Sequence, residues 1–198
     1  MSYTVTGSIP PTAANWTESL SIPQFQSNLG TLTSVTLTLN GSMSTTLIAG
    51  NITGSTFVPT PDPSSGSAGV VAQFGLQDSG GSLSGLSIVS PMEGYSFAAG
   101  GSQSWSLSTA DSSSAVYTDS STLGEFTGPG NITLDAAGTA FTNQVNTGGV
   151  SYAGQNTISS LTADVTYTYS ASVPEPSTIA LLGVGIVTLL AYRRARHS

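Results

Sequence analysis

The strict alternation of residues 161–170 is the feature that most constrains the fold. In this stretch, LTADVTYTYS, an apolar or aromatic residue occupies every second position, and Thr, Asp or Ser occupies the positions between. Successive side chains of a β-strand point to opposite faces, so the pattern predicts a strand with one buried and one solvated face. Residues 34–40 (SVTLTLN) and 3–9 (YTVTGSI) repeat it. The chain is therefore expected to be all-β.

Shorter apolar stretches, each bounded by Gly, Ser, Asn or Pro, predict further strands. They are Thr17–Ile22, Ser44–Thr53, Val70–Leu76, Leu86–Val89, Ser104–Ser108, Ala115–Thr118, Asn131–Leu134 and Val150–Ala153. Three connections look long, namely Val58–Gly69, Asp78–Gly85 and Phe97–Ser104. No segment before Ser172 shows a convincing helical period. The pattern predicts one antiparallel β-sandwich, jelly-roll or Ig-like, over residues 1–171.

Charge is scarce and one-sided in this chain. Charged residues make up 7% of the sequence, with ten acidic residues, three Arg and no Lys. All three Arg follow Tyr192, whereas every acidic residue except Glu175 precedes Val173. Salt bridges therefore do not stabilise the predicted sandwich. Neutralising phosphates requires Lys or Arg, so the composition excludes nucleic acid as a partner of this domain.

The same composition removes most kinds of catalysis. No His, Cys, Lys or Arg precedes Arg193, which excludes Ser-His-Asp and Cys-His catalysis, His-ligated zinc and a Schiff-base lysine. A carboxylate pair, as in glycoside hydrolysis, stays open. The acids that could supply it are Glu93, Asp111, Asp119, Glu125 and Asp164. No spacing singles out two of them, so we predict no catalytic residue and do not expect an enzyme.

Two binding sites are weighed as alternatives. Residues 111–126 (DSSSAVYTDSSTLGEF) are rich in the oxygen ligands that calcium prefers, but they lack the spacing of an EF-hand loop. Loop calcium is therefore an open alternative, and no cofactor is predicted. Trp16, Trp105 and the tyrosines could stack on sugars, yet Trp105 alternates with Leu107 and is expected to face the core.

The chain changes character at Ser172. Pro174 and Pro176 disfavour both helix and sheet, so residues 172–178 are expected to be an extended joint. Residues 179–192 are apolar apart from Thr188. As a helix they would span about 21 Å, less than the roughly 30 Å of a bilayer core, so a buried core helix is an alternative by length.

Two observations favour a membrane helix over a core helix. The run of residues 179–192 has no polar face, which a helix at the surface of a soluble domain would show. The basic residues Arg193, Arg194 and Arg196 follow it directly, as the positive-inside rule places them. We therefore predict a single C-terminal transmembrane helix, with the sandwich outside and residues 193–198 as a basic cytoplasmic tail.

Pro-Glu-Pro, a short apolar helix and a terminal Arg cluster together resemble the PEP-CTERM sorting signal of exosortase-processed bacterial proteins. The resemblance covers residues 173–196. It implies that Val173, Pro174, Glu175 and Pro176 are the recognition motif of an exosortase-type membrane processing enzyme, which would cut at or near them. It also implies that Arg193, Arg194 and Arg196 hold the tail inside until processing.

Residues 15–42 are similar to the opening of choice-of-anchor E domains. The positions that carry this similarity are Trp16, Leu20, Ile22, Pro23, Phe25, Leu29, Gly30, Leu32, Val35 and Leu37. That family has no established activity to transfer. Exosortase substrates resemble other exported proteins in having a signal peptide, and residues 1–16 lack its basic and apolar regions. We therefore expect the true start of the protein to lie upstream of Met1.

These observations predict an exported structural protein of the cell surface or extracellular matrix. It would be anchored in the membrane of the cell envelope before processing, and surface-bound or secreted afterwards. Its acidic, hydroxyl-rich surface suits contact with hydrated exopolysaccharide. One alternative is a carbohydrate-binding module or carboxylate-based glycosidase on the same anchor. Another is a single-pass membrane protein that is never processed.

Overall fold

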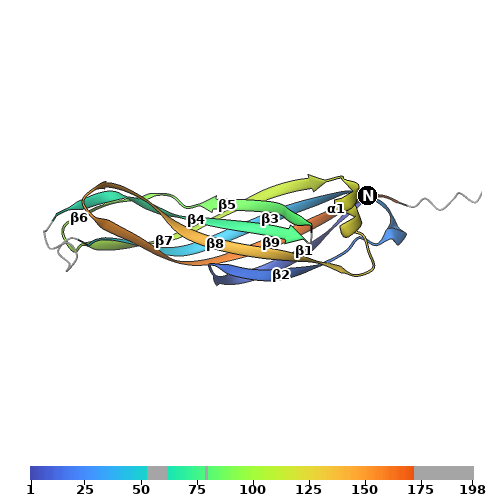
Figure 1. The fold of residues 1–198 in the computed structure, drawn as a ribbon, viewed down its shortest axis with the longest axis horizontal. Coiled ribbons are helices and arrows are strands. Elements are labelled where there is room, and N and C mark those ends of the chain that lie inside the picture. Colours follow the sequence, from blue (N-terminus) through green and yellow to red (C-terminus); the bar gives the residue numbers. More distant parts are fainter. Residues whose placement is uncertain (53–61, 79, 172–198) are drawn as a thin grey trace, which may run out of the picture.

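The computed structural model describes residues 1–52, 62–78 and 80–171, which form an elongated all-β body (Figure 1). In chain order its elements are β1 (Ser2–Ala13), β2 (Trp16–Pro23), the 3-10 helix η1 (Ser27–Leu29), β3 (Gly30–Asn51), β4 (Ser64–Asp78), β5 (Gly81–Val89), β6 (Glu93–Phe97), β7 (Ser102–Tyr117), α1 (Ser120–Glu125), β8 (Asn131–Gly148) and β9 (Ser151–Ala171).

The strands form two antiparallel sheets. Sheet A has the order β1-β9-β3-β7, and sheet B has the order β2-β8-β4-β5, with β6 also pairing with β4. Apolar side chains from the two sheets meet in one core between them. The predicted all-β class and antiparallel pairing are therefore confirmed, and the arrangement is consistent with a sandwich. The finer class, jelly-roll or Ig-like, stays a prediction.

The alternation in the sequence becomes the two faces of sheet A. Val35, Leu37 and Leu39 of β3 and Val165 of β9 are fully buried, as the pattern predicts. Tyr167 of β9 is also fully buried, and its hydroxyl donates a hydrogen bond to the Pro23 carbonyl oxygen at 2.8 Å. Burying side chains of this size contributes about 1.5–3 kcal/mol each. Burial also raises the pKa of the Tyr167 hydroxyl, so it stays a donor.

Several strands are longer than predicted. The predicted strands at 34–40 and 44–53 are both parts of β3, which ends at Asn51. In the same way, β7 joins the strands predicted at 104–108 and 115–118. β9 joins those predicted at 150–153 and 161–170. Gly and Ser between these segments predict turns, but in the structure they continue the strands. At Gly41 a Cβ would lie 2.8 Å from Leu86 Cδ2, so a side chain of sheet B fills the space above this glycine.

The structure corrects the three connections predicted to be long, of which residues 58–61 and 79 lie outside the described part of the chain. Ser64–Gly69 is the first part of β4 and pairs with β6 and β8. Asp78 and Gly81 already pair as the ends of the β4–β5 hairpin. The Asp78 Oδ1 atom accepts hydrogen bonds there from the Gly80 and Gly81 N–H groups, at 2.7 and 2.9 Å. The third connection is short, because β6 ends at Phe97 and β7 begins at Ser102.

The sandwich differs in width along its length. At one end, called the α1 end, all of β1, β9, β3 and β7 face β2, β8, β4 and β5. At the other, called the β6 end, β1 and β2 have already stopped near Ala13 and Trp16, and β5 is replaced by β6. Ala171, the last described residue, pairs with Gly30 at the α1 end. The described part of β9 therefore ends at the α1 end (Figure 1).

Candidate functional site

The predicted sorting residues follow directly after β9. The motif Val173–Pro176, the predicted membrane helix at 179–192 and the basic residues Arg193, Arg194 and Arg196 all lie outside the described residues. Within the part of the chain that the structure describes, no helix is long and apolar enough to span a membrane.

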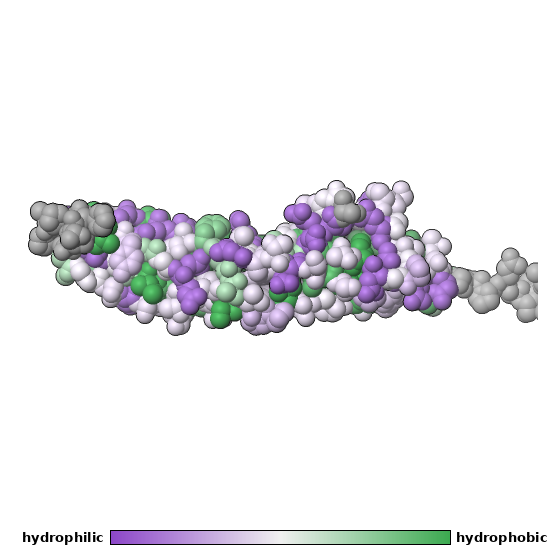
Figure 2. All heavy atoms as spheres, turned by 60° about the horizontal axis from the view of Figure 1, so that its bottom comes forward, coloured by the Kyte–Doolittle hydropathy of each residue, from purple (hydrophilic) through white to green (hydrophobic). Residues whose placement is uncertain are grey.

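The outer face of sheet A carries many hydroxyl groups, and the exposed apolar side chains Ile48, Val116, Tyr152 and Ile158 lie on the same face. Even-numbered residues of its strands point outward, because the odd-numbered ones fill the core. Three cross-strand rows, called the hydroxyl face below, run Thr4–Thr166–Thr36, Thr6–Asp164–Thr38–Ser114 and Ser8–Thr162–Asn40–Ser112, and the first row ends on β7 at the exposed Val116. In the view of Figure 2 pale residues predominate, and strongly apolar ones form small separate patches.

Hydrogen bonds across the strands hold these side chains in place. The hydroxyl oxygens of Thr4 and Thr166 are 2.7 Å apart. Asp164 accepts hydrogen bonds from the Thr6 hydroxyl at 2.6 Å and from the Asn40 side-chain amide at 3.0 Å. All of these groups are at the surface. The face therefore offers ordered donors and acceptors to a hydrated partner without a cleft.

The structure places the candidate carboxylates in separate parts of the molecule. Asp164 lies on the hydroxyl face, Asp111 in the middle of β7 and Glu93 at the start of β6. Only Asp119 and Glu125 come together, at the two ends of α1. Asp78, an acid that no motif singled out, joins them from the β4–β5 hairpin.

Asp78, Asp119 and Glu125 line a recess of about 300 Å³ together with Tyr117. A hydrogen bond to Asp78, burial and the nearby negative charges raise the pKa of Glu125. Asp119 caps α1, and its hydrogen bonds from the Thr122 backbone and the Ser121 hydroxyl lower its pKa to about 2. The Oε2 atom of Glu125 is buried and has no hydrogen-bond partner among the described residues.

The calcium candidate is divided by the fold. Asp111 belongs to β7, whereas Asp119 lies beyond the end of that strand and caps α1. Among the described residues, no group of three or more His, Cys, Asp or Glu side chains is placed to hold a metal ion. Loop calcium therefore gains no support from this arrangement.

The aromatic candidates for sugar stacking face the core or lie apart. Trp16 is 7% exposed, and its Nε1–H donates to the Ser159 hydroxyl at 2.9 Å. Trp105 packs half-buried against the core, as its alternation with Leu107 predicts. The exposed rings of Phe141 and Tyr152 lie on sheets B and A, respectively. The described residues thus form no row of exposed aromatic rings.

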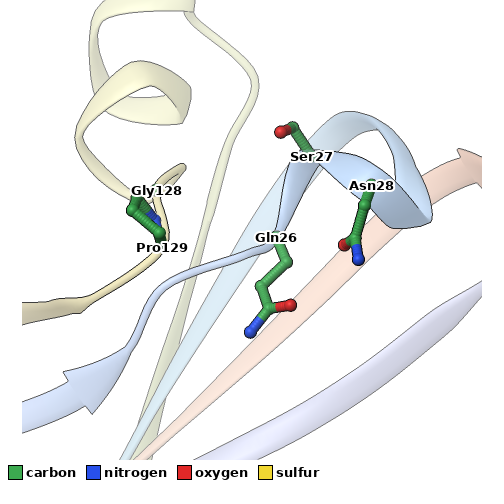
Figure 3. Close-up of a pocket in the computed structure, with 5 residues that line it drawn as sticks. All are labelled: Gln26, Ser27, Asn28, Gly128 and Pro129. Atoms are coloured by element: carbon green, nitrogen blue, oxygen red, sulfur yellow. The ribbon is translucent and has the colours of Figure 1, made fainter.

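A neutral recess at the α1 end was not foreseen. It has a volume of about 420 Å³ and is lined by Gln26, Ser27, Asn28, Gly128 and Pro129. Figure 3 shows Gln26, Ser27 and Asn28 on one side and Gly128 and Pro129 on the other. These residues carry no ionisable side chain and form no sequence motif, so no signal could have identified the recess. Amide and hydroxyl groups there can form hydrogen bonds but supply no acid or base.

Comparison with known proteins gives a clear result only for the tail. Residues 172–196 match a family model described as the PEP-CTERM protein-sorting motif. No curated protein matches the chain in sequence. Among solved structures, a chain of the T13 IBDV viral particle is similar at 12% identity over 86% of this chain and 36% of that chain. Its TM-score is 0.19, too low to carry an argument about fold or function, and this chain spans about a third of its length.

The motif match agrees with the prediction made from Pro174, Glu175 and Pro176. It supports export, membrane anchoring before processing by an exosortase, and association with the cell surface afterwards. The protein thus carries a PEP-CTERM sorting signal at its C-terminal end.

Proposed function

We propose that this protein is a structural component of the cell surface or extracellular matrix and not an enzyme. Its sandwich would be displayed outside the membrane, and Val173–Pro176 would be the motif that the exosortase recognises. Residues 179–192 would span the membrane until processing, with Arg193, Arg194 and Arg196 on the cytoplasmic side. The similarity of residues 15–42 to choice-of-anchor E domains fits this proposal, because such domains occur with different anchoring tails.

The hydroxyl face is the observation that carries the structural role. It is broad and hydrogen-bonded across strands, and Asp164 is the one charged side chain in its three rows. Hydroxyl groups exchange hydrogen bonds with water and with sugars at little net cost, and ordered waters can bridge the two. We propose hydrated exopolysaccharide as the partner of this face. Many weak contacts over a displayed surface would provide adhesion without a deep binding site.

The sorting step is tested in the native host by intact mass and terminal peptides of the envelope-bound and released forms. We expect wild-type protein to lose the residues beyond the Val173–Pro176 region. The double variant Pro174→Ala, Pro176→Ala should keep its tail, whereas the neighbouring Ser177→Ala control should be processed normally. A wild-type chain that still ends at Ser198 would instead identify a plain membrane-tethered protein.

The polysaccharide contact is tested by co-sedimentation of the protein with matrix polysaccharide isolated from the same host. The triple variant Thr4→Val, Thr36→Val, Thr166→Val removes one row of hydroxyls from the hydroxyl face. The matched control Thr17→Val, Thr133→Val, Thr139→Val removes as many from sheet B. We expect the first to weaken binding about ten-fold, or about 1.4 kcal/mol, and the second to leave it unchanged. Equal effects of the two variants would contradict the proposal.

A further inference from the structure

The outer edge of β7 is an unpaired strand edge with one charged side chain, Asp111. β7 pairs with β3 on one side, and no other described strand pairs with it. The carbonyl oxygen of Gly101, just before β7, accepts a hydrogen bond from the N–H of Asn51, the last residue of β3. The N–H of Ser112 instead points away from β3 and donates to the Asp111 carboxylate at 2.8 Å. Backbone groups alternate in direction along a strand. Even-numbered residues from Ser104 to Ser114 therefore present their N–H and C=O groups at the edge.

The opposite edge of sheet A shows how this fold protects a strand. β1 carries Pro10 and Pro11, and its register with β9 shifts between Ile9 and Thr12. Prolines, bulges and charged side chains are the usual devices that prevent edge-to-edge pairing. β7 has no proline or basic residue, and its register with β3 is unbroken from Ser102 to Tyr117. Its one charge is Asp111.

The inner side of β7 also has apolar surface to cover. Trp105 and Tyr117 are only half-buried, whereas their partners on β3, Leu47 and Val35, are fully buried. A strand added beside β7 would shield these rings from water. The edge therefore combines free backbone groups, small outward side chains and apolar surface that gains from burial.

We propose that β7 pairs in antiparallel fashion with the β7 strand of a second copy, which joins the two A sheets into one. Antiparallel pairing of a strand edge with its own copy places the same residues on both sides of a two-fold axis, which is an isologous contact, and the edge-facing residues Ser104, Ser106, Ser108, Ala110, Ser112 and Ser114 are all small. Asp111 is the single charged residue of β7, so each copy brings one carboxylate to this contact.

The test uses the full chain in detergent and the natural absence of cysteine. Ala110→Cys, near the centre of β7, is treated with a short bis-maleimide and compared with Ser8→Cys on the protected edge. We expect Ala110→Cys to give at least ten times more cross-linked dimer than Ser8→Cys. The Ser8→Cys yield measures the background from contacts between copies that the tail brings together. Equal yields from both would overturn the proposal.

A second change separates specific pairing from proximity. The substitution Ser108→Pro, added to Ala110→Cys, removes an edge-facing N–H that does not bond to β3, so edge pairing is lost while β7 itself can persist. We expect at least a ten-fold loss of cross-linked dimer with unchanged near-ultraviolet circular dichroism. Ser106→Pro serves the same purpose if Ser108→Pro unfolds. Undiminished cross-linking in a folded proline variant would contradict the proposal.

Discussion

The two ends of the sandwich are held together by different interactions. At the α1 end, the rings of Tyr3, Phe25 and Tyr167 pack with centroids 5.2–6.3 Å apart, and Phe126 and Tyr169 extend the cluster. At the β6 end, the rings of Tyr95 and Phe97 stack at 5.1 Å. Polar side chains surround the Tyr95 hydroxyl there: Gln144, Asn146 and Ser151.

This difference follows the number of strands available at each end. Where eight strands lie in two layers, inner side chains are covered from every direction and can all be apolar. Where β1 and β2 have stopped, the free edges of β8 and β9 are joined by side-chain hydrogen bonds, including Ser151 to Asn146 at 2.6 Å. Stability should therefore be concentrated at the α1 end, next to the sorting signal.

The largest effect is expected from truncation in the aromatic cluster. Phe25→Ala removes a fully buried ring and leaves a cavity, which should lower the free energy of unfolding by about 3–5 kcal/mol. Phe97→Ala at the β6 end should cost less, because Phe97 is 8% exposed and stacks on one ring. Urea denaturation of both variants measures the difference. An equal decrease in the free energy of unfolding would show that the two ends contribute equally to stability.

A smaller effect is expected from Tyr95→Phe. The change removes the hydroxyl that links β6 to Gln144 and Ser151, and it should cost about 1–3 kcal/mol because buried polar groups lose their partner. Tyr152→Phe is the control. That residue is 44% exposed, so removing its hydroxyl should leave the free energy of unfolding unchanged. Thermal unfolding of the two variants gives the comparison.

Hydrogen exchange should reveal the same gradient without any substitution. Backbone amides of residues 35–39 lie where β3 has the full width of the sandwich around it, and those of residues 45–49 lie where β1 and β2 are missing. We expect exchange at least about ten-fold slower in the first group. Uniform protection along β3 would show that the sandwich opens as one unit.

The smallest effect concerns pH at the recess beside α1. The pKa of Asp119 is lowered to about 2, so its contribution to stability is complete above its ordinary value of 3.8 and is lost as the pH falls toward 2. The pKa of Glu125 is raised above 4.5, so protonating it on acidification stabilises the fold. Urea denaturation midpoints measured from pH 7 to 2 should show both effects in the wild type. The loss of stability toward pH 2 should be absent in Asp119→Asn, and the stabilisation by protonation should be absent in Glu125→Gln. Unchanged profiles would contradict these assignments.

Much of this architecture could be predicted from local pattern. Alternation identified the buried faces of β3 and β9, and Pro-Glu-Pro with its apolar run and Arg cluster identified the sorting signal. The lengths of the strands could not be predicted, because Gly and Ser look like turn residues when their surroundings are unknown. At Gly138 a Cβ would overlap the Trp16 ring, so a residue far away in sequence fills the space of the missing side chain.

The recess at α1 escaped prediction for the same reason. Asp78 and Glu125 are far apart in the chain, and only the pairing of β4 with β5 and the turn after β7 bring them together. The spacing of two residues in the sequence predicts that they lie together only when both belong to the same helix or strand. The hydroxyl face, in contrast, follows from alternation within each strand.

The position of β9 has a mechanical consequence. This strand is hydrogen-bonded to β1 on one side and to β3 on the other, and it ends at Ala171, one residue before the sorting motif. Ladder hydrogen bonds run perpendicular to the strand axis. A pull on the anchored tail would therefore shear both ladders at once instead of unzipping them bond by bond. The chain thus leaves the described domain from a strand that resists a force along its axis at Ala171.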